Sequence, residues 1–136
     1  VNLDANLFIV GDRHKLQQVL INIFMNSIQA IESNGMIEIN AQKKKMGEID
    51  FDITASYELE DEIIEITIDD NGSGIAENKL NKVFDPFFTT KPSGEGTGLG
   101  LTVVQNILRL HKAKIHYENK QGGGVKVTIL INTTGD

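Results

Sequence analysis

Four amide side chains near the start of the chain are spaced so that they could hold a metal ion against phosphate. On a helix, Gln18, Asn22, Asn26 and Gln29 fall within a polar stripe roughly 80° wide. Mg²⁺ bound to nucleotide phosphates takes one or two protein oxygens, and a neutral amide supplies one without repelling the phosphates. Asn26 lies nearest to the apolar face of the helix, so it is the predicted ligand. A solvated helix edge would show the same pattern.

Two carboxylates and two glycines follow an apolar segment, in the run Asp69-Asp70-Asn71-Gly72-Ser73-Gly74-Ile75. Side chains alternate along a strand, so Asp69 and Asp70 are expected to face opposite sides. One carboxylate could accept a hydrogen bond from a ligand amino group, while the glycines let the backbone pass close to a flat ring. The alternative is a plain turn of the Asp-Asn-Gly type.

A glycine cluster, GEGTGLGL over 94–101, stands just before a segment with helical periodicity. Backbone N–H groups at a helix N-terminus favour an anion, and glycine lets phosphate oxygens reach them. The spacing matches neither the Walker A loop nor the Rossmann fingerprint. Upstream of it, Phe84, Phe87, Phe88 and Lys91 lie in an irregular segment. Such a segment either plugs a small core or forms a lid, and Lys91 could meet a phosphate.

The elements that position these residues are read from periodicity. We expect helices over 13–32, with Asp12 as N-cap, over 77–82 and over 99–110, and strands within 3–10 and over 36–41, 50–59, 63–68, 115–118 and 125–131. This order predicts one α/β (α+β) domain over 1–136. Its architecture is a two-layer α/β sandwich, a mixed and mostly antiparallel sheet with helices on one face.

Composition narrows the function classes. The 136 residues carry a net charge of −6 and no cysteine, which argues against a general nucleic-acid binder, a disulfide framework and a thiolate zinc site. No apolar stretch reaches the roughly 18–20 residues of a membrane span. The basic run Lys43–Lys45 is short and is read as a solvated strand end or turn. The start of the chain looks like a cut from a longer protein.

Taken together in this order, the motifs resemble the ATP-binding catalytic domain of bacterial sensor histidine kinases. The N box is Asn22 with Asn26, the first glycine box is DNGSGI over 70–75, the F box is FDPFFTTK over 84–91, and the second glycine box is GTGLGL over 96–101. The resemblance covers about 12–131 and is greatest to the nitrogen-regulation and C4-dicarboxylate-sensing branches. The glycine boxes alone would also suit other members of the GHKL superfamily.

This resemblance implies the Bergerat ATP-binding fold, with ATP and Mg²⁺ as cofactors and 76–97 as an ATP lid. Asn26 would hold Mg²⁺ and, with Lys91, serve catalysis, while Asp70 would bind the adenine amino group. The remaining nucleotide contacts that it implies are Asn22, Gln29, Gly72, Gly74, Ile75, Gly96, Thr97, Gly98, Leu99, Gly100 and Leu101. The chain departs from the common pattern at Gln29, where a cation is usual, and at Val125, where threonine is usual.

The resemblance also implies partners. The phosphoacceptor histidine of such kinases lies on a separate helical hairpin, and His14, His111 and His116 do not suit that role. The expected partners are ATP and ADP, the histidine-bearing dimerisation domain of the same parent protein and, through it, a response regulator. We expect a cytoplasmic, monomeric domain without nucleic-acid or membrane contact, whether or not the parent is anchored in a membrane. The alternatives are a GHKL-type ATPase and a nucleotide-sensing interaction module without kinase activity.

Overall fold

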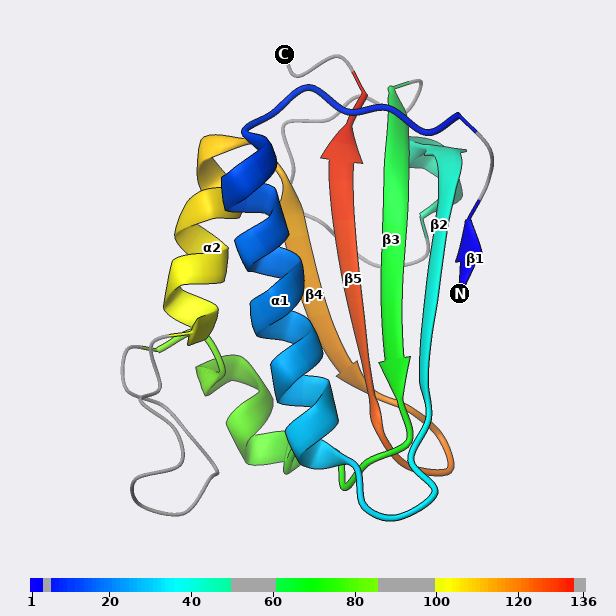
Figure 1. Ribbon diagram of the computed structural model, residues 1–136, viewed down its shortest axis with the longest axis vertical. Coiled ribbons are helices and arrows are strands. Elements are labelled where there is room, and N and C mark those ends of the chain that lie inside the picture. The colour runs from blue at the N-terminus through cyan, green and yellow to red at the C-terminus, as the bar shows by residue number, and fades with distance from the viewer. Residues whose placement is uncertain (4–5, 50–60, 86–99, 134–136) are drawn as a thin grey trace.

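The computed structural model describes residues 1–3, 6–49, 61–85 and 100–133 (Figure 1). In chain order the elements are β1 (Asn2–Leu3), α1 (Arg13–Ala30), β2 (Ile37–Lys45), the 3₁₀ helix η1 (Met46–Glu48), β3 (Glu62–Asp70), the 3₁₀ helix η2 (Glu77–Lys82), α2 (Gly100–Leu110), β4 (Lys114–Asn119) and β5 (Val125–Asn132).

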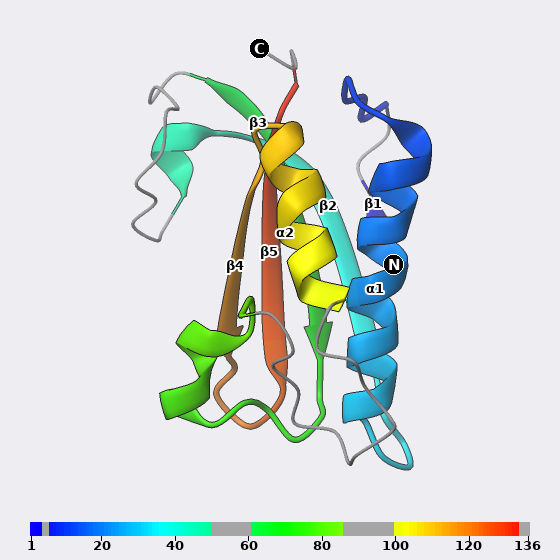
Figure 2. The ribbon, with the colours of Figure 1, turned by 90° about the vertical axis from the view of Figure 1, so that its left-hand side faces the viewer.

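The described strands form one mixed sheet in the order β1-β2-β3-β5-β4. β1 pairs with β2 in parallel, and the other neighbours are antiparallel. Figure 2 shows α1 and α2 side by side on one face of this sheet. The predicted two-layer α/β sandwich with a mostly antiparallel sheet is therefore confirmed.

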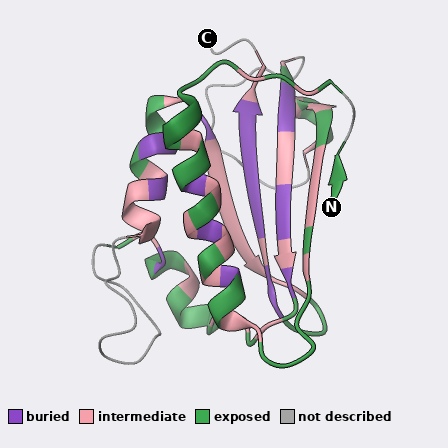
Figure 3. Ribbon diagram, viewed as in Figure 1, coloured by how far each residue is buried: buried purple, intermediate pink, exposed green. Residues whose placement is uncertain are grey.

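The core lies between the helices and that face of the sheet. α1 contributes Val19 and Ile23, and α2 contributes Val104 and Leu108, all of them buried. Figure 3 shows buried residues along the central strands β3 and β5. Those that complete this core are Ile68 on β3 and Val125, Val127, Ile129 and Ile131 on β5. Burying one such side chain stabilises the fold by about 1.5–3 kcal/mol. The packing of these two faces therefore sets how the helices sit on the strands.

Two hydrogen bonds of Asp12, one local and one to a distant residue, fix where α1 begins. The Asp12 side chain accepts a hydrogen bond from the Lys15 backbone N–H at 3.1 Å, the bond of a helix N-cap. A second contact fixes the same point, because the Asp12 backbone N–H donates to His111 Nε2 at 3.0 Å. His111 Nδ1 lies 2.8 Å from the Ile107 carbonyl oxygen, so the neutral ring bonds at both nitrogens. His111 is thus structural, and it joins the end of α2 to the start of α1.

One predicted strand is corrected. The strand expected within 3–10, at the LFIV segment, is absent: residues 7–10 pair with no other described strand, and the described strand near this end of the chain is β1 (Asn2–Leu3). Asn6 has a φ of 63°, so the chain turns away from the sheet there and crosses to α1. Residues 7–10 still alternate between half-buried and exposed, which explains why they resemble a strand.

The other expected elements are confirmed or lie outside the described residues. β2 and β3 are longer than predicted, and Lys43–Lys45 forms the end of β2. The short helix over 77–82 is present as η2, and α2, β4 and β5 lie where expected. The strand expected over 50–59 lies outside the described residues. In the part of the chain that the structure describes, no helix is long and apolar enough to cross a membrane.

Candidate functional site

Asp70 is the last residue of β3 and is buried, with 3% of its surface exposed. Its Oδ1 accepts two backbone hydrogen bonds, from Gly72 N–H at 2.9 Å and from Val125 N–H at 3.2 Å. No donor among the described residues reaches the other carboxylate oxygen. A buried carboxylate with one oxygen fixed and the other open to a donor is suited to accept a hydrogen bond from a ligand.

Asp69 faces the opposite side of the sheet, as the alternation predicts. It lies opposite Glu38 on β2 and Lys126 on β5 and is half-buried. Desolvation raises the pKa of Asp69, although the nearby cations Lys120 and Lys126 oppose that effect. Of the two carboxylates, Asp70 is therefore the one on the side of the helices.

Glycines allow the backbone to pack tightly around Asp70. A Cβ on Gly72 would lie 2.5 Å from the Ala30 carbonyl oxygen, and Gly74 has a φ of 76°. A Cβ on Gly124, which has a φ of 94°, would lie 1.9 Å from the Asp70 carbonyl oxygen. We expected Gly72 and Gly74 to let a ligand ring approach. In the structure, the absence of a side chain at Gly72 makes room for the Ala30 carbonyl group at the end of α1. Gly124 lies in the turn between β4 and β5.

Asn119 holds the segment that leads from Asp70 toward the predicted lid. Its Oδ1 accepts from Ile75 N–H at 2.8 Å, and its Nδ2 donates to the Ile75 carbonyl oxygen and to Glu77 Oε1. The side chain amide therefore binds both backbone groups of one residue. Asn119 is not among the site residues predicted from the sequence. In the sequence it is only an amide directly after the strand predicted over 115–118, and its register with Val125, beside Asp70, comes from the folded sheet.

The amide stripe of α1 lies beside the start of α2. Asn22 Nδ2 donates to the Gly100 carbonyl oxygen at 3.2 Å. Asn22 and Asn26 are half-buried, whereas Gln18 and Gln29 are exposed. A Cβ on Gly100 would meet none of the described atoms within 4 Å, so the first turn of α2 borders open space in the described structure. Asn22 thus lies next to the N-terminus of α2.

The described part of the predicted lid is attached at its base. Val83 is buried, and the Phe84 ring packs edge-on against Tyr117 with centroids 5.5 Å apart and an interplanar angle of 80°. The Thr102 hydroxyl donates to the Phe84 carbonyl oxygen at 3.4 Å, which links this segment to α2. Other predicted site residues lie outside the described residues: Phe87, Phe88, Lys91, Gly96, Thr97, Gly98 and Leu99.

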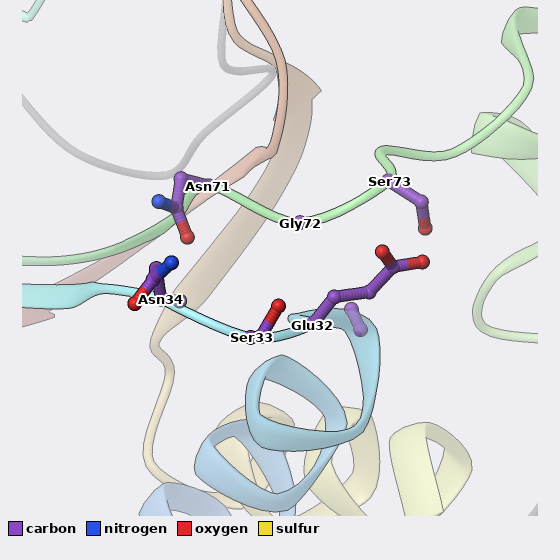
Figure 4. A pocket seen from close by; sticks show the side chains of 8 residues that line it. Glu32, Ser33, Asn34, Asn71, Gly72 and Ser73 are labelled. Carbon is purple, nitrogen blue, oxygen red and sulfur yellow. The ribbon is translucent and has the colours of Figure 1, made fainter.

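A polar pocket of about 320 Å³ lies next to Gly72, where the end of α1 meets the loop after β3. Figure 4 shows Asn71, Gly72 and Ser73 on one side of it and Glu32, Ser33 and Asn34 on the other. Of the predicted nucleotide contacts in the described chain, Gly72 alone lines it. This hollow therefore borders the candidate site and does not include Asp70.

Known proteins are similar to this chain in sequence and in fold. Residues 11–135 match the profile of the HATPase_c family, described as histidine kinase-, DNA gyrase B- and HSP90-like ATPase. The chain belongs to this family. It is 37% identical over 123 residues to the sensor histidine kinase ZraS of Escherichia coli K12, an alignment that covers 90% of this chain and 23% of ZraS. It is 38% identical to AtoS, a signal transduction histidine-protein kinase of the same strain, over 89% of this chain and 17% of AtoS.

A solved histidine kinase structure shares the fold. The catalytic domain of the histidine kinase ThkA superposes with a TM-score of 0.74 at 31% identity and covers 98% of this chain and 80% of that structure. The resemblance to sensor histidine kinases is thereby confirmed. The chain spans less than a quarter of the length of ZraS and AtoS.

Proposed function

We propose that this HATPase_c domain binds Mg·ATP and presents its γ-phosphate to a histidine on a separate helical hairpin of its parent protein. The observation that carries the proposal is the Asp70 carboxylate. Its Oδ1 is fixed by two backbone N–H groups, and no described donor reaches its other oxygen. A buried acceptor of this kind suits the exocyclic amino group of adenine.

The two ends of the site supply different chemistry. At the base end, Asp70 would accept from the amino group, while Gly72, Gly74 and Ile75 shape the surface beside it. At the phosphate end, the first turn of α2 lies against Asn22 and would offer backbone N–H groups to the phosphates. Gly96–Leu101 and Lys91 complete this end in our proposal, and Gln29 would contact the nucleotide only from the rim.

The described side chains suit an Mg²⁺ ion that takes most of its ligands from the nucleotide and water and few from the protein. Among the described residues, no group of three or more His, Cys, Asp or Glu side chains could hold a metal ion. Mg²⁺ at a nucleotide site needs only one or two protein oxygens, and the half-buried amide of Asn26 would supply one. The bound ion would neutralise charge on the phosphates. Through this contact Asn26 would orient the triphosphate.

Phosphoryl transfer depends mostly on positioning and charge stabilisation, which this domain would provide for the nucleotide. His111 is engaged at both ring nitrogens, so we propose that the acceptor histidine is on the hairpin of the parent kinase. The hairpin would pass the phosphoryl group to a response regulator. Because the reaction consumes ATP, we infer that the domain works in the cytoplasm.

The test uses γ-labelled ATP, this chain and the histidine-bearing hairpin of its parent. We expect acid-labile, base-stable label on the hairpin. Label released only as free phosphate would favour a GHKL-type ATPase. Nucleotide binding with neither product would favour a sensing module. Asp70→Asn should remove labelling, and Asp69→Asn, which changes the neighbouring carboxylate on the other face, should retain it.

A further inference from the structure

The side chain of Tyr117 carries a hydroxyl group into the interior of the domain, where it lacks a described hydrogen-bond partner. Its Oη is buried and has no hydrogen-bond partner in the described structure. The ring is fixed by its edge-on contact with Phe84 and by packing against the core. Native proteins pair nearly all buried side-chain polar atoms, since an unpaired one lowers stability. An unpaired hydroxyl held by a packed ring therefore needs an explanation.

The position of Tyr117 connects this hydroxyl to the candidate site. Tyr117 lies on β4 two residues before Asn119, on the face that α1 and α2 cover. Asn119 pairs with Val125, and Val125 N–H donates to Asp70. Asp70 and Asn119 thus lie on either side of Val125 across the sheet, in one row of neighbouring residues. Tyr117 lies in the next row on the same face, two residues along β4 from Asn119.

The charges agree with this placement. Burial raises the pKa of Tyr117, and the negative charge of Asp70 raises it further, so the hydroxyl keeps its proton at neutral pH. A neutral hydroxyl can donate one hydrogen bond and accept others. The Asp70 carboxylate can only accept. The two groups therefore offer a ligand one acceptor and one donor from neighbouring rows.

We propose that the Tyr117 hydroxyl is a base-specificity group of the nucleotide site, pairing with the base held on Asp70 directly or through one buried water. The inference rests on the proposed function. Adenine presents an amino donor next to a ring-nitrogen acceptor, which matches a carboxylate beside a hydroxyl. Guanine presents a carbonyl acceptor next to a ring N–H donor at the corresponding edge and does not match. Binding of adenine would satisfy the hydroxyl that the described structure leaves unpaired.

The test compares this chain with Tyr117→Phe, which removes the hydroxyl and keeps the ring that contacts Phe84. Thr128→Val is the matched control, because it removes a buried hydroxyl from the opposite face of the sheet. Dissociation constants for Mg·ATP, ADP and Mg·GTP are measured by calorimetry, and the Tm is measured without nucleotide. We expect Tyr117→Phe to weaken ATP and ADP binding by about tenfold, to leave GTP binding unchanged, and to keep or raise the Tm.

Other results would overturn the assignment. Unchanged ATP affinity in Tyr117→Phe, with or without a lower Tm, would show that the hydroxyl serves only the fold. Equal losses for ATP and GTP would show that Tyr117 does not read the base. An equal loss of ATP affinity in Thr128→Val would show a general effect of hydroxyl removal. If the unmodified chain binds no nucleotide, the proposed function itself fails, which is distinct from a failure of Tyr117 alone.

Discussion

The Val125 backbone N–H donates to Asp70 Oδ1 over 3.2 Å, so the first residue of β5 fixes the side chain of the last residue of β3. Gly72 N–H donates to the same oxygen at 2.9 Å. The orientation of this carboxylate is therefore set by backbone groups from two separate segments. A single substitution can therefore change one contact around Asp70, or one contact of helix α1, and leave the other contacts in place.

Asp70→Asn should weaken Mg·ATP binding by about 10–100-fold, because it replaces a charged acceptor in a buried site. The asparagine Oδ1 can still accept from Gly72 and Val125, so the fold should be retained. Calorimetric titration with Mg·ATP measures the affinity, and circular dichroism checks the fold. Asp69→Asn is the control, since that side chain faces away from the helices. Equal affinities for the two variants would contradict the role of Asp70.

Gly124→Ala should destabilise the domain more than Gly122→Ala. Both glycines have positive φ, at 94° and 87°, so both substitutions carry the left-handed cost of about 1–2 kcal/mol. A Cβ on Gly122 meets none of the described atoms within 4 Å, whereas one on Gly124 would overlap the Asp70 carbonyl oxygen. Gly124→Ala should cost about 1–3 kcal/mol more, as an overpacked site does. Urea unfolding of both variants measures the difference, and equal midpoints would refute the close approach.

Asn119→Asp should lower both stability and nucleotide affinity. The aspartate keeps an acceptor for Ile75 N–H but loses the donor to the Ile75 carbonyl oxygen, and it places a second carboxylate beside Glu77. We expect a loss of about 1–3 kcal/mol in the free energy of unfolding. Asn40→Asp is the control, since Asn40 donates to Glu38 at an exposed position. Chemical unfolding and Mg·ATP titration measure the two effects, and a similar result for both variants would argue against the role of Asn119.

Asp12→Ser should make the stability of the domain less dependent on acid. Serine keeps an N-cap oxygen but carries no charge. The hydrogen bond from the Lys15 backbone N–H is the largest cause that lowers the pKa of Asp12 below its usual 3.8. A lowered pKa in the folded state means that the charged cap contributes fully above pH 3.8 and loses its contribution as the pH falls through the lowered pKa.

The measurement is the Tm of the unmodified protein and of the Asp12→Ser variant across the acid range. The difference between the two Tm values should shrink as the pH falls below 3.8. A difference that stays constant over this range would show that the charge of Asp12 adds nothing to the cap.

The sequence alone predicted the helices and most strands, because their periodic apolar residues and the cap at Asp12 are local signals. It was wrong about the strand within 3–10, because alternation at residues 7–10 cannot show that Asn6 turns the chain away from the sheet. The family motifs also came from the sequence. Through the resemblance to the kinase motifs, they pointed to Asp70 and Asn26 as site residues.

Only the tertiary structure showed what surrounds those residues. Gly124, Asn119 and Tyr117 lie far from Asp70 in the chain, and strand pairing brings their segments to the same end of the sheet. The elements and the residue types of the site could therefore be predicted from local patterns, because these depend on neighbours along the chain. The orientation of Asp70, its tight backbone packing and the burial of the Tyr117 hydroxyl were decided by the sheet register, which is a property of non-local contacts.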